Sequence, residues 1–267
     1  MTTGSDAPAL NIRHEDAVAW LTLNRPDRLN ALNTGLVTAL REFFETLVRS
    51  PTATRVVVLQ GAGRAFCAGL DLKERPPRML EVEEGLALQR QFSGLILAMR
   101  RCPQPIIAVV QGAASGGGMA LALASDIRLG TPDARLNAAF VRVGLSGCDV
   151  GVSYLLPRLV GASVASEPLL TGRFLDAPRA LALGLFSEVA ALETIQASAA
   201  ALATDMLNSN PLGLSLTKEA LGLNLDAPSL EAAIALEDRN QVLCARTDGF
   251  AAAKAAFLAR RPGGAAS

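Results

Sequence analysis

The first two thirds of the chain alternate short apolar runs with stretches of helical periodicity. Apolar runs that end at glycine or polar turn residues are typical of buried strands. Such runs predict strands at 17–23, 55–60, 104–110, near 125–129 and near 135–139. The segments between them predict three helices: one capped by Asn33 or Thr34 and running to about Val48, one ending near Arg101, and one starting near Gly117.

The last hundred residues have a different pattern, in which alanine and leucine dominate. Helices are expected there at 162–170, 177–183, 193–208, 211–223, 228–246 and 249–260. Strands alternating with helices, followed by helices alone, predict an α/β core over 1–190 and a helical C-terminal region over 191–267. The charged, proline-bearing segment 74–84 is expected to be a mobile loop, and the terminal RPGGAAS to be disordered.

Two strand ends carry similar sequences, VVLQGAG at 57–63 and AVVQGAA at 108–114. Each closes a buried strand and precedes a further glycine-containing segment. One interpretation is that strand–turn junctions simply look alike. The other is that the chain contains repeated units whose exits converge on one site.

Composition narrows the class of protein. The 267 residues include 25 Lys and Arg and 25 Asp and Glu, and this zero formal charge argues against nucleic acid or an anionic membrane as the main partner. A hydrophobic fraction of 50% excludes intrinsic disorder, and no run of about 20 apolar residues predicts a membrane span. The N-terminus lacks a signal-peptide pattern, and the widely spaced cysteines fit a reducing compartment, so we expect a cytoplasmic protein.

Histidine occurs once, at His14. A Ser-His-Asp triad or a multi-histidine metal site would have to use that residue, which we expect on the surface near an early strand. We therefore expect no metal site.

The strongest candidate for ligand binding is the run of glycines at 116–118, which precedes the apolar segment MALALA. Glycine lets a ligand approach the backbone, and the free N–H groups of a helix's first turn attract anions. Tight packing of that helix against a sheet is the alternative. A P-loop lysine is absent, and the dinucleotide fingerprint starting at Gly61 is incomplete because Phe66 stands at its third glycine.

Four segments together resemble the enoyl-CoA hydratase/isomerase (crotonase) superfamily. They are LNRPDRLNALN (23–33), GRAFCAGLDLKE (63–74), QGAASGGGMALALASDIRL (111–129) and GLSGCDVGVSYLLPRLVG (144–161). The resemblance implies an α/β fold, the crotonase (ClpP-like) spiral of ββα units, with a helical C-terminal region that builds homotrimers or dimers of trimers. It implies an acyl-CoA thioester as substrate and no cofactor besides the coenzyme A that the substrate carries.

The resemblance also implies a site. The thioester oxygen is expected between the backbone N–H groups of Leu70 and Gly117, which would stabilise an enolate-like oxyanion. Asp71 is expected to orient the loop that carries Leu70. Contacts to coenzyme A are expected from Arg28, Arg64, Ala68, Lys73 and, from a neighbouring subunit, Phe257.

The sequence departs from the resemblance at two positions where the family's hydratases carry glutamates. Here these positions are Ala120 and Phe140, neither of which can move a proton. Asp149 is the remaining candidate, at a position that is catalytic in the dienoyl-CoA isomerase branch. An apolar pocket formed by Ala120, Phe140 and Val143 would make Asp149 a better base.

We therefore expect an enzyme that shifts a double bond in an enoyl-CoA or adds water to it, with the shift favoured. The alternative is a non-catalytic acyl-CoA-binding protein on the same scaffold. A structural alternative for Asp149 is a helix cap near Val150. Cys67 and Cys148, which have no histidine to activate them, are expected to be small packing residues.

Overall fold

Two sheets and ten α-helices make up the part of the chain that the computed structural model describes, residues 7–50, 53–74 and 78–259. The larger sheet has the order β1 (Leu10–Glu15), β2 (Val18–Leu23), β3 (Val56–Gly61), β4 (Ile106–Val110), β6 (Ile127–Gly130) and β9 (Glu188–Val189). Only the β1–β2 pair is antiparallel. The smaller sheet contains β5 (Ala113–Ser115), β7 (Arg135–Asn137) and β8 (Leu175–Asp176).

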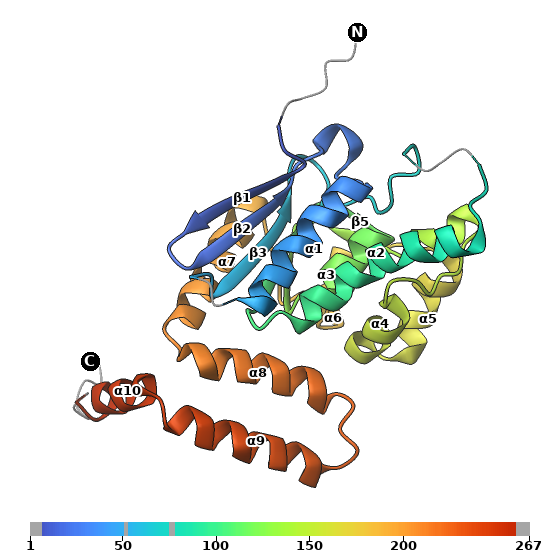
Figure 1. Cartoon of the computed structure of the whole chain (residues 1–267). Helices are drawn as coiled ribbons and strands as arrows, with labels where there is room; N and C mark the ends of the chain where they lie inside the picture. Colours follow the sequence, from blue (N-terminus) through green and yellow to red (C-terminus); the bar gives the residue numbers. More distant parts are fainter. Residues whose placement is uncertain (1–6, 51–52, 75–77, 260–267) are drawn as a thin grey trace.

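The continuous apolar runs of the sequence form the centre of the larger sheet. All five residues of β4 and the first four of β3 are buried, because helices cover both faces. On one face lie α1 (Thr34–Arg49), α2 (Val82–Arg101) and α3 (Gly117–Ala124), and on the other lies α7 (Leu192–Leu207) (Figure 1). The predicted strands and helices of the core are therefore confirmed, with ends shifted by a few residues.

The two similar strand ends belong to repeated units. β3 and β4 are parallel neighbours, so the segments that follow them leave the sheet at the same end of the strands. There Gln111 Nε2 donates a hydrogen bond to Gly63 O (3.3 Å), and a Cβ on Gly112 would lie 2.2 Å from Arg64 O. After the turn, each unit adds a short strand or bridge to a second layer: Leu32 pairs with Leu70, and Cys67 with Ala114. The interpretation of the two similar segments as repeated units whose exits lie together is confirmed.

A short 3-10 segment, 26–28, lies between β2 and α1. Between α3 and the C-terminal region lie a second 3-10 segment, 139–143, and the helices α4 (Val152–Val160), α5 (Ala162–Thr171) and α6 (Ala177–Ala182). The sequence analysis missed β5, β8 and β9, each of two or three residues, and did not delimit α4. It also missed β1, whose residues after Leu10 are exposed, so the strand lacks a buried apolar run.

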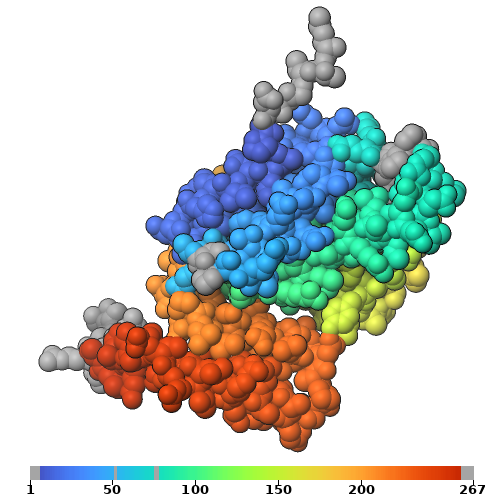
Figure 2. Space-filling model, viewed as in Figure 1, coloured from blue at the N-terminus to red at the C-terminus, as the bar shows by residue number. Residues whose placement is uncertain are grey.

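The C-terminal helices α8 (Pro211–Asn224), α9 (Leu230–Ala245) and α10 (Asp248–Ala259) extend from the core along one side (Figures 1 and 2). A buried lysine fixes α8 to the core. Lys218 Nζ lies 2.9 Å from Asp126 Oδ2 and donates a hydrogen bond to Gln104 O (2.8 Å). Asp126 also pairs with Arg100 (2.9 Å), so the ion pair belongs to a network.

The predicted loop 74–84 is partly helical. Glu81 and Glu84 form a capping box that starts α2 at Val82, and Arg78 pairs with Glu84 at 2.9 Å. Residues 75–77 and the terminal segment from 260 onward lie outside the described residues, so the expectations of mobility and disorder there stay predictions.

Candidate active site

A narrow cavity of about 100 Å³ lies between the N-terminal half of α2, the start of α3 and the segment 139–150. It brings together six residues singled out in the sequence: Ala68, Leu70, Gly117, Phe140, Val143 and Asp149. The other lining residues are Leu32, Gly69, Leu72, Gln89, Phe92, Gly116, Ala139, Leu145 and Val150. The wall is therefore apolar except for one carboxylate, one carboxamide and exposed backbone.

Leu70 is the first candidate backbone donor in the wall of this cavity. The bridge to Leu32 uses only the neighbours of Leu70: Leu32 N donates to Gly69 O (2.7 Å), and Asp71 N donates to Leu32 O (2.9 Å). The N–H of Leu70 consequently has no hydrogen-bond partner among the described residues. The pairing with Leu32 holds this donor in place without occupying it.

Gly117 supplies the second donor, as the first residue of α3. The first-turn N–H groups of a helix have no partner within it, and the positive end of the helix dipole adds to their attraction for an anion. Gly118 beside it is required for packing, because a Cβ there would lie 2.1 Å from Cys67 O. Close packing is therefore confirmed at Gly118, and ligand binding at Gly117 stays a prediction.

Gly69 allows the two donors to approach each other. Its φ is +91°, and a Cβ on it would lie 2.6 Å from Ser115 O and 3.3 Å from Gly117 N. On the far side of the loop, Arg25 Nη2 pairs with Asp71 Oδ2 at 2.9 Å. This ion pair links the loop that carries Leu70 to Arg25, and the role of Asp71 in orienting the loop stays a prediction.

Asp149 carries the only titratable side chain among the described residues that line the cavity. Its Oδ1 accepts a hydrogen bond from Val150 N (2.7 Å) and another from Gln89 Nε2. It does not cap the helix that follows: α4 begins after Gly151 and has no side-chain cap bond. The capping alternative is therefore wrong for this carboxylate.

Sequence reasoning missed Gln89. The residue is half-buried on α2 and lies 60 positions before Asp149, so only the packing of α2 over the segment 139–150 brings the two together. One available signal was that Gln89 and Phe92 are spaced i, i+3 and so share a face of the predicted helix.

The comparison with known proteins gives a consistent result. A family model described as enoyl-CoA hydratase/isomerase matches residues 13–263. The chain belongs to the enoyl-CoA hydratase/isomerase family. It is 38% identical over 251 residues to a Mycobacterium leprae protein named "probable enoyl-CoA hydratase echA12", covering 92% of this chain and 85% of that protein. It is 35% identical to the 1,2-epoxyphenylacetyl-CoA isomerase of Escherichia coli, covering 92% and 94% of the two chains.

Solved structures agree with this assignment. The crystal structure of a "putative enoyl-CoA hydratase" from Streptomyces coelicolor has a TM-score of 0.89 and 38% sequence identity to this protein. The match covers 97% of this chain and 96% of that one. The expected α/β crotonase fold is confirmed.

This enoyl-CoA hydratase/isomerase family member carries no carboxylate at the two departing positions. Phe140 places its ring against the start of α3, where a Cβ on Gly116 would lie 3.3 Å from its Cε1. Ala120 is fully buried in the core and does not reach the cavity wall, unlike Phe140 and Val143.

Of the residues expected to contact coenzyme A, only Ala68 lines the cavity. Arg28, Arg64 and Lys73 are exposed, and none is ion-paired with a described residue. Arg28 and Arg64 come from adjacent turns, because a Cβ on Gly63 would lie 3.1 Å from Pro26 Cβ. Phe257 is exposed on α10 and does not line the cavity of its own chain.

The cysteines give one confirmation and one correction. Cys67 is a buried packing residue, and burial raises the pKa of its thiol to about 12. Cys148, also expected to pack, is exposed because it lies in the surface segment before Asp149. Within the described ranges, no group of His, Cys, Asp and Glu could hold a metal ion, and no helix is long and apolar enough to cross a membrane.

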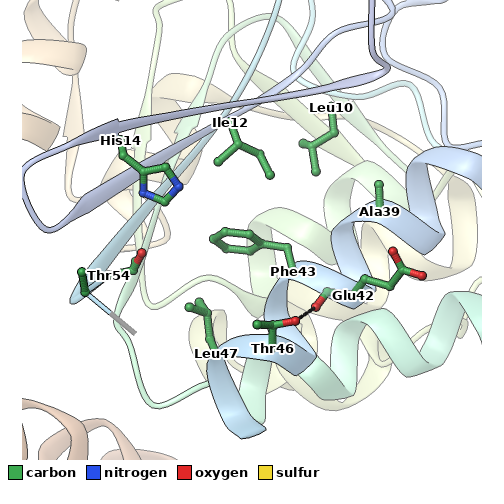
Figure 3. A pocket seen from close by; sticks show the side chains of 10 residues that line it. Leu10, Ile12, His14, Ala39, Glu42, Phe43, Thr46, Leu47 and Thr54 are labelled. Atoms are coloured by element: carbon green, nitrogen blue, oxygen red, sulfur yellow. Dashed lines mark hydrogen bonds between the residues drawn. The ribbon is translucent and has the colours of Figure 1, made fainter. Parts of the chain in front are cut away.

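A second hollow of about 570 Å³ lies between β1 and α1 and contains His14, which is on the surface as expected (Figure 3). Its acidic residue, Glu42, lies on the opposite side of Phe43 from His14 (Figure 3). The two side chains therefore do not form an acid–base pair.

Proposed function

We propose that this protein binds an enoyl-CoA thioester and moves its double bond by a 1,3-proton shift, with Asp149 as the single proton carrier. The observation that carries the proposal is that Asp149 is the one titratable side chain among the described residues of a cavity whose other lining side chains, apart from Gln89, are apolar. The two unoccupied backbone donors, Leu70 N–H and Gly117 N–H, line the same cavity and support a thioester oxygen there.

The proposed reaction on a 3-enoyl-CoA has two steps. Asp149 removes a proton from C2, and the electron pair of that C–H bond forms a dienolate with its charge on the thioester oxygen. Asp149 then returns the proton to C4, which leaves the double bond between C2 and C3. The carboxylate ends in its starting form, so no other acid or base is required.

Hydration of the double bond requires more proton-transfer groups than the proton shift does. It needs a water molecule to be activated at C3 and a proton delivered to C2, which is easier with two separate carboxylates. The relevant family positions are Ala120 and Phe140 here. This difference favours the proton shift over the addition of water.

The substrate and assembly follow from the same proposal. The exposed cations Arg28, Arg64 and Lys73 would meet the phosphates of coenzyme A. We further propose a homotrimer or a dimer of trimers, in which Phe257 reaches the nucleotide of a neighbouring subunit. The exposure of Phe257, at 74%, supports a partner for this part of α10, and light scattering on the intact protein measures the assembly.

The test uses 2-enoyl-CoA and 3-enoyl-CoA esters in heavy water, with products identified by mass spectrometry and NMR. The proposal predicts a moved double bond and no added water, with deuterium entering the acyl chain to the extent that the proton held by Asp149 exchanges with solvent before it returns to C4. Gain of one water would establish hydration instead. The second candidate, a non-catalytic acyl-CoA-binding protein, is motivated by the absence of both glutamates, and it predicts a bound, unchanged ester.

A further inference from the structure

We infer that Gln89 is a positioning residue, which holds the Asp149 carboxylate so that one defined oxygen exchanges the proton. The inference rests on the proposed role of Asp149 and adds a residue to that same site. Gln89 and Asp149 are the two polar side chains among the described residues of the cavity wall, and they contact each other.

The hydrogen bonds distinguish the two oxygens of the carboxylate. Gln89 Nε2 and Val150 N both donate to Oδ1 of Asp149, the latter at 2.7 Å. Oδ2 accepts no hydrogen bond from any described residue. Two donors from different elements fix the plane of the carboxylate, and they leave Oδ2 as the oxygen that takes and returns a proton.

The backbone beside Asp149 supports this arrangement independently. Val150 has a φ of +38°, in the left-handed region that a β-branched side chain rarely adopts. Such a conformation persists only where the surroundings enforce it, and it is common at functional sites. The N–H of this residue is one of the two donors to Oδ1, so the carboxylate is bound to a backbone segment in an enforced conformation.

Gln89 is itself held firmly enough to position another group. Two to three turns further along α2, Leu95, Ile96 and Met99 are buried in the core, which fixes the helix axis. A carboxamide does not titrate, so Gln89 cannot act as the base. Its remaining function at this contact is to donate the hydrogen bond.

The experiment compares Gln89→Leu and Gln89→Glu with a matched control, Gln91→Leu. Gln91 lies two residues away on α2 and is exposed, and its side chain makes no hydrogen bond to a described residue. We expect both Gln89 variants to lower kcat for isomerisation by about 10- to 100-fold, the cost of a group misplaced by about 1 Å, with KM changed by less than about threefold. The control should retain full activity.

Gln89→Glu separates positioning from packing. It keeps the size and shape of the side chain but, when ionised, presents only acceptors to Asp149. Wild-type kcat in Gln89→Glu would overturn the inference, as would a Gln89→Leu variant whose loss lies in KM alone.

Crystal structures provide a readout that does not depend on turnover. The inference requires the Gln89–Asp149 contact in the wild-type crystal and more than one orientation of the Asp149 carboxylate in Gln89→Leu. An unchanged carboxylate in that variant would overturn it. If the wild-type protein binds esters without isomerising them while the crystals show the released carboxylate, the proposed function fails and the positioning by Gln89 stands.

Discussion

Replacing Gly69 by alanine is expected to disable the candidate oxyanion hole while the protein stays folded. The new methyl group would lie 2.6 Å from Ser115 O, and ordinary contact begins at 3.4 Å, so the two segments must separate by about 0.8 Å. The segments concerned carry the two donors: Leu70 follows Gly69, and Gly117 N lies 3.3 Å from the methyl position.

The expected cost follows from the geometry of an oxyanion hole. Its donors act at 2.7–3.1 Å from the developing charge, so a displacement of about 0.8 Å removes most of one interaction. Loss of one donor typically lowers kcat by about 10²–10³-fold, or about 3–4 kcal/mol. The positive φ of Gly69 adds about 1–2 kcal/mol to the destabilisation of the folded state.

Gly184→Ala is the matched control, because Gly184 also has a positive φ (+70°) but no atom within 4 Å of the Cβ position. Isomerisation kinetics and urea unfolding of both variants give the comparison. We expect Gly184→Ala to lose stability and keep wild-type kcat, and Gly69→Ala to lose kcat as well. Equal kcat in the two variants would refute the placement of the oxyanion hole between Leu70 and Gly117.

Two further predictions concern the core and the thiols. Lys218→Met is expected to lower the free energy of unfolding by about 3 kcal/mol, because it leaves the partly buried Asp126 without one of its partners. Urea unfolding measures the loss, with Lys254→Met, at an exposed lysine, as the control. Equal losses in the two variants would refute the stabilising role of the Lys218–Asp126–Arg100 network. Iodoacetamide at pH 8 should label Cys148 and spare Cys67 in the native protein, because Cys67 is buried and its raised pKa of about 12 keeps the reactive thiolate scarce. Peptide mass spectrometry identifies the labelled residue, and rapid labelling of Cys67 in the native protein would contradict its burial.

Local sequence predicted the centre of the fold well and its edges poorly. β3 and β4 are buried on both faces, so their apolar runs are continuous and recognisable. β1 lies at the sheet edge, where exposed polar residues hide the strand, and β5 has only three residues. The order of the repeats followed from the resemblance, since strand–helix alternation alone fits a simple parallel sheet equally well.

The candidate site shows the same division. Leu70, Gly117 and Asp149 lie in motifs that are continuous in sequence, so they could be named before their geometry was known. Gln89 could not be named in this way, because a polar residue on an amphipathic helix is ordinarily expected to face solvent. Its role becomes visible only when packing places it against Asp149. Ala120 was expected in the pocket from its motif position, but the fold of α3 turns it into the core.

The most direct test of the account is the rate of double-bond migration in Asp149→Asn. Asparagine keeps the shape of the side chain and an oxygen that can accept the bonds from Gln89 and Val150, but it cannot carry the proton. The account predicts that turnover of 3-enoyl-CoA falls by about 10²–10⁴-fold while the ester still binds. Unchanged turnover in this variant would show that another group moves the proton and would contradict the central claim.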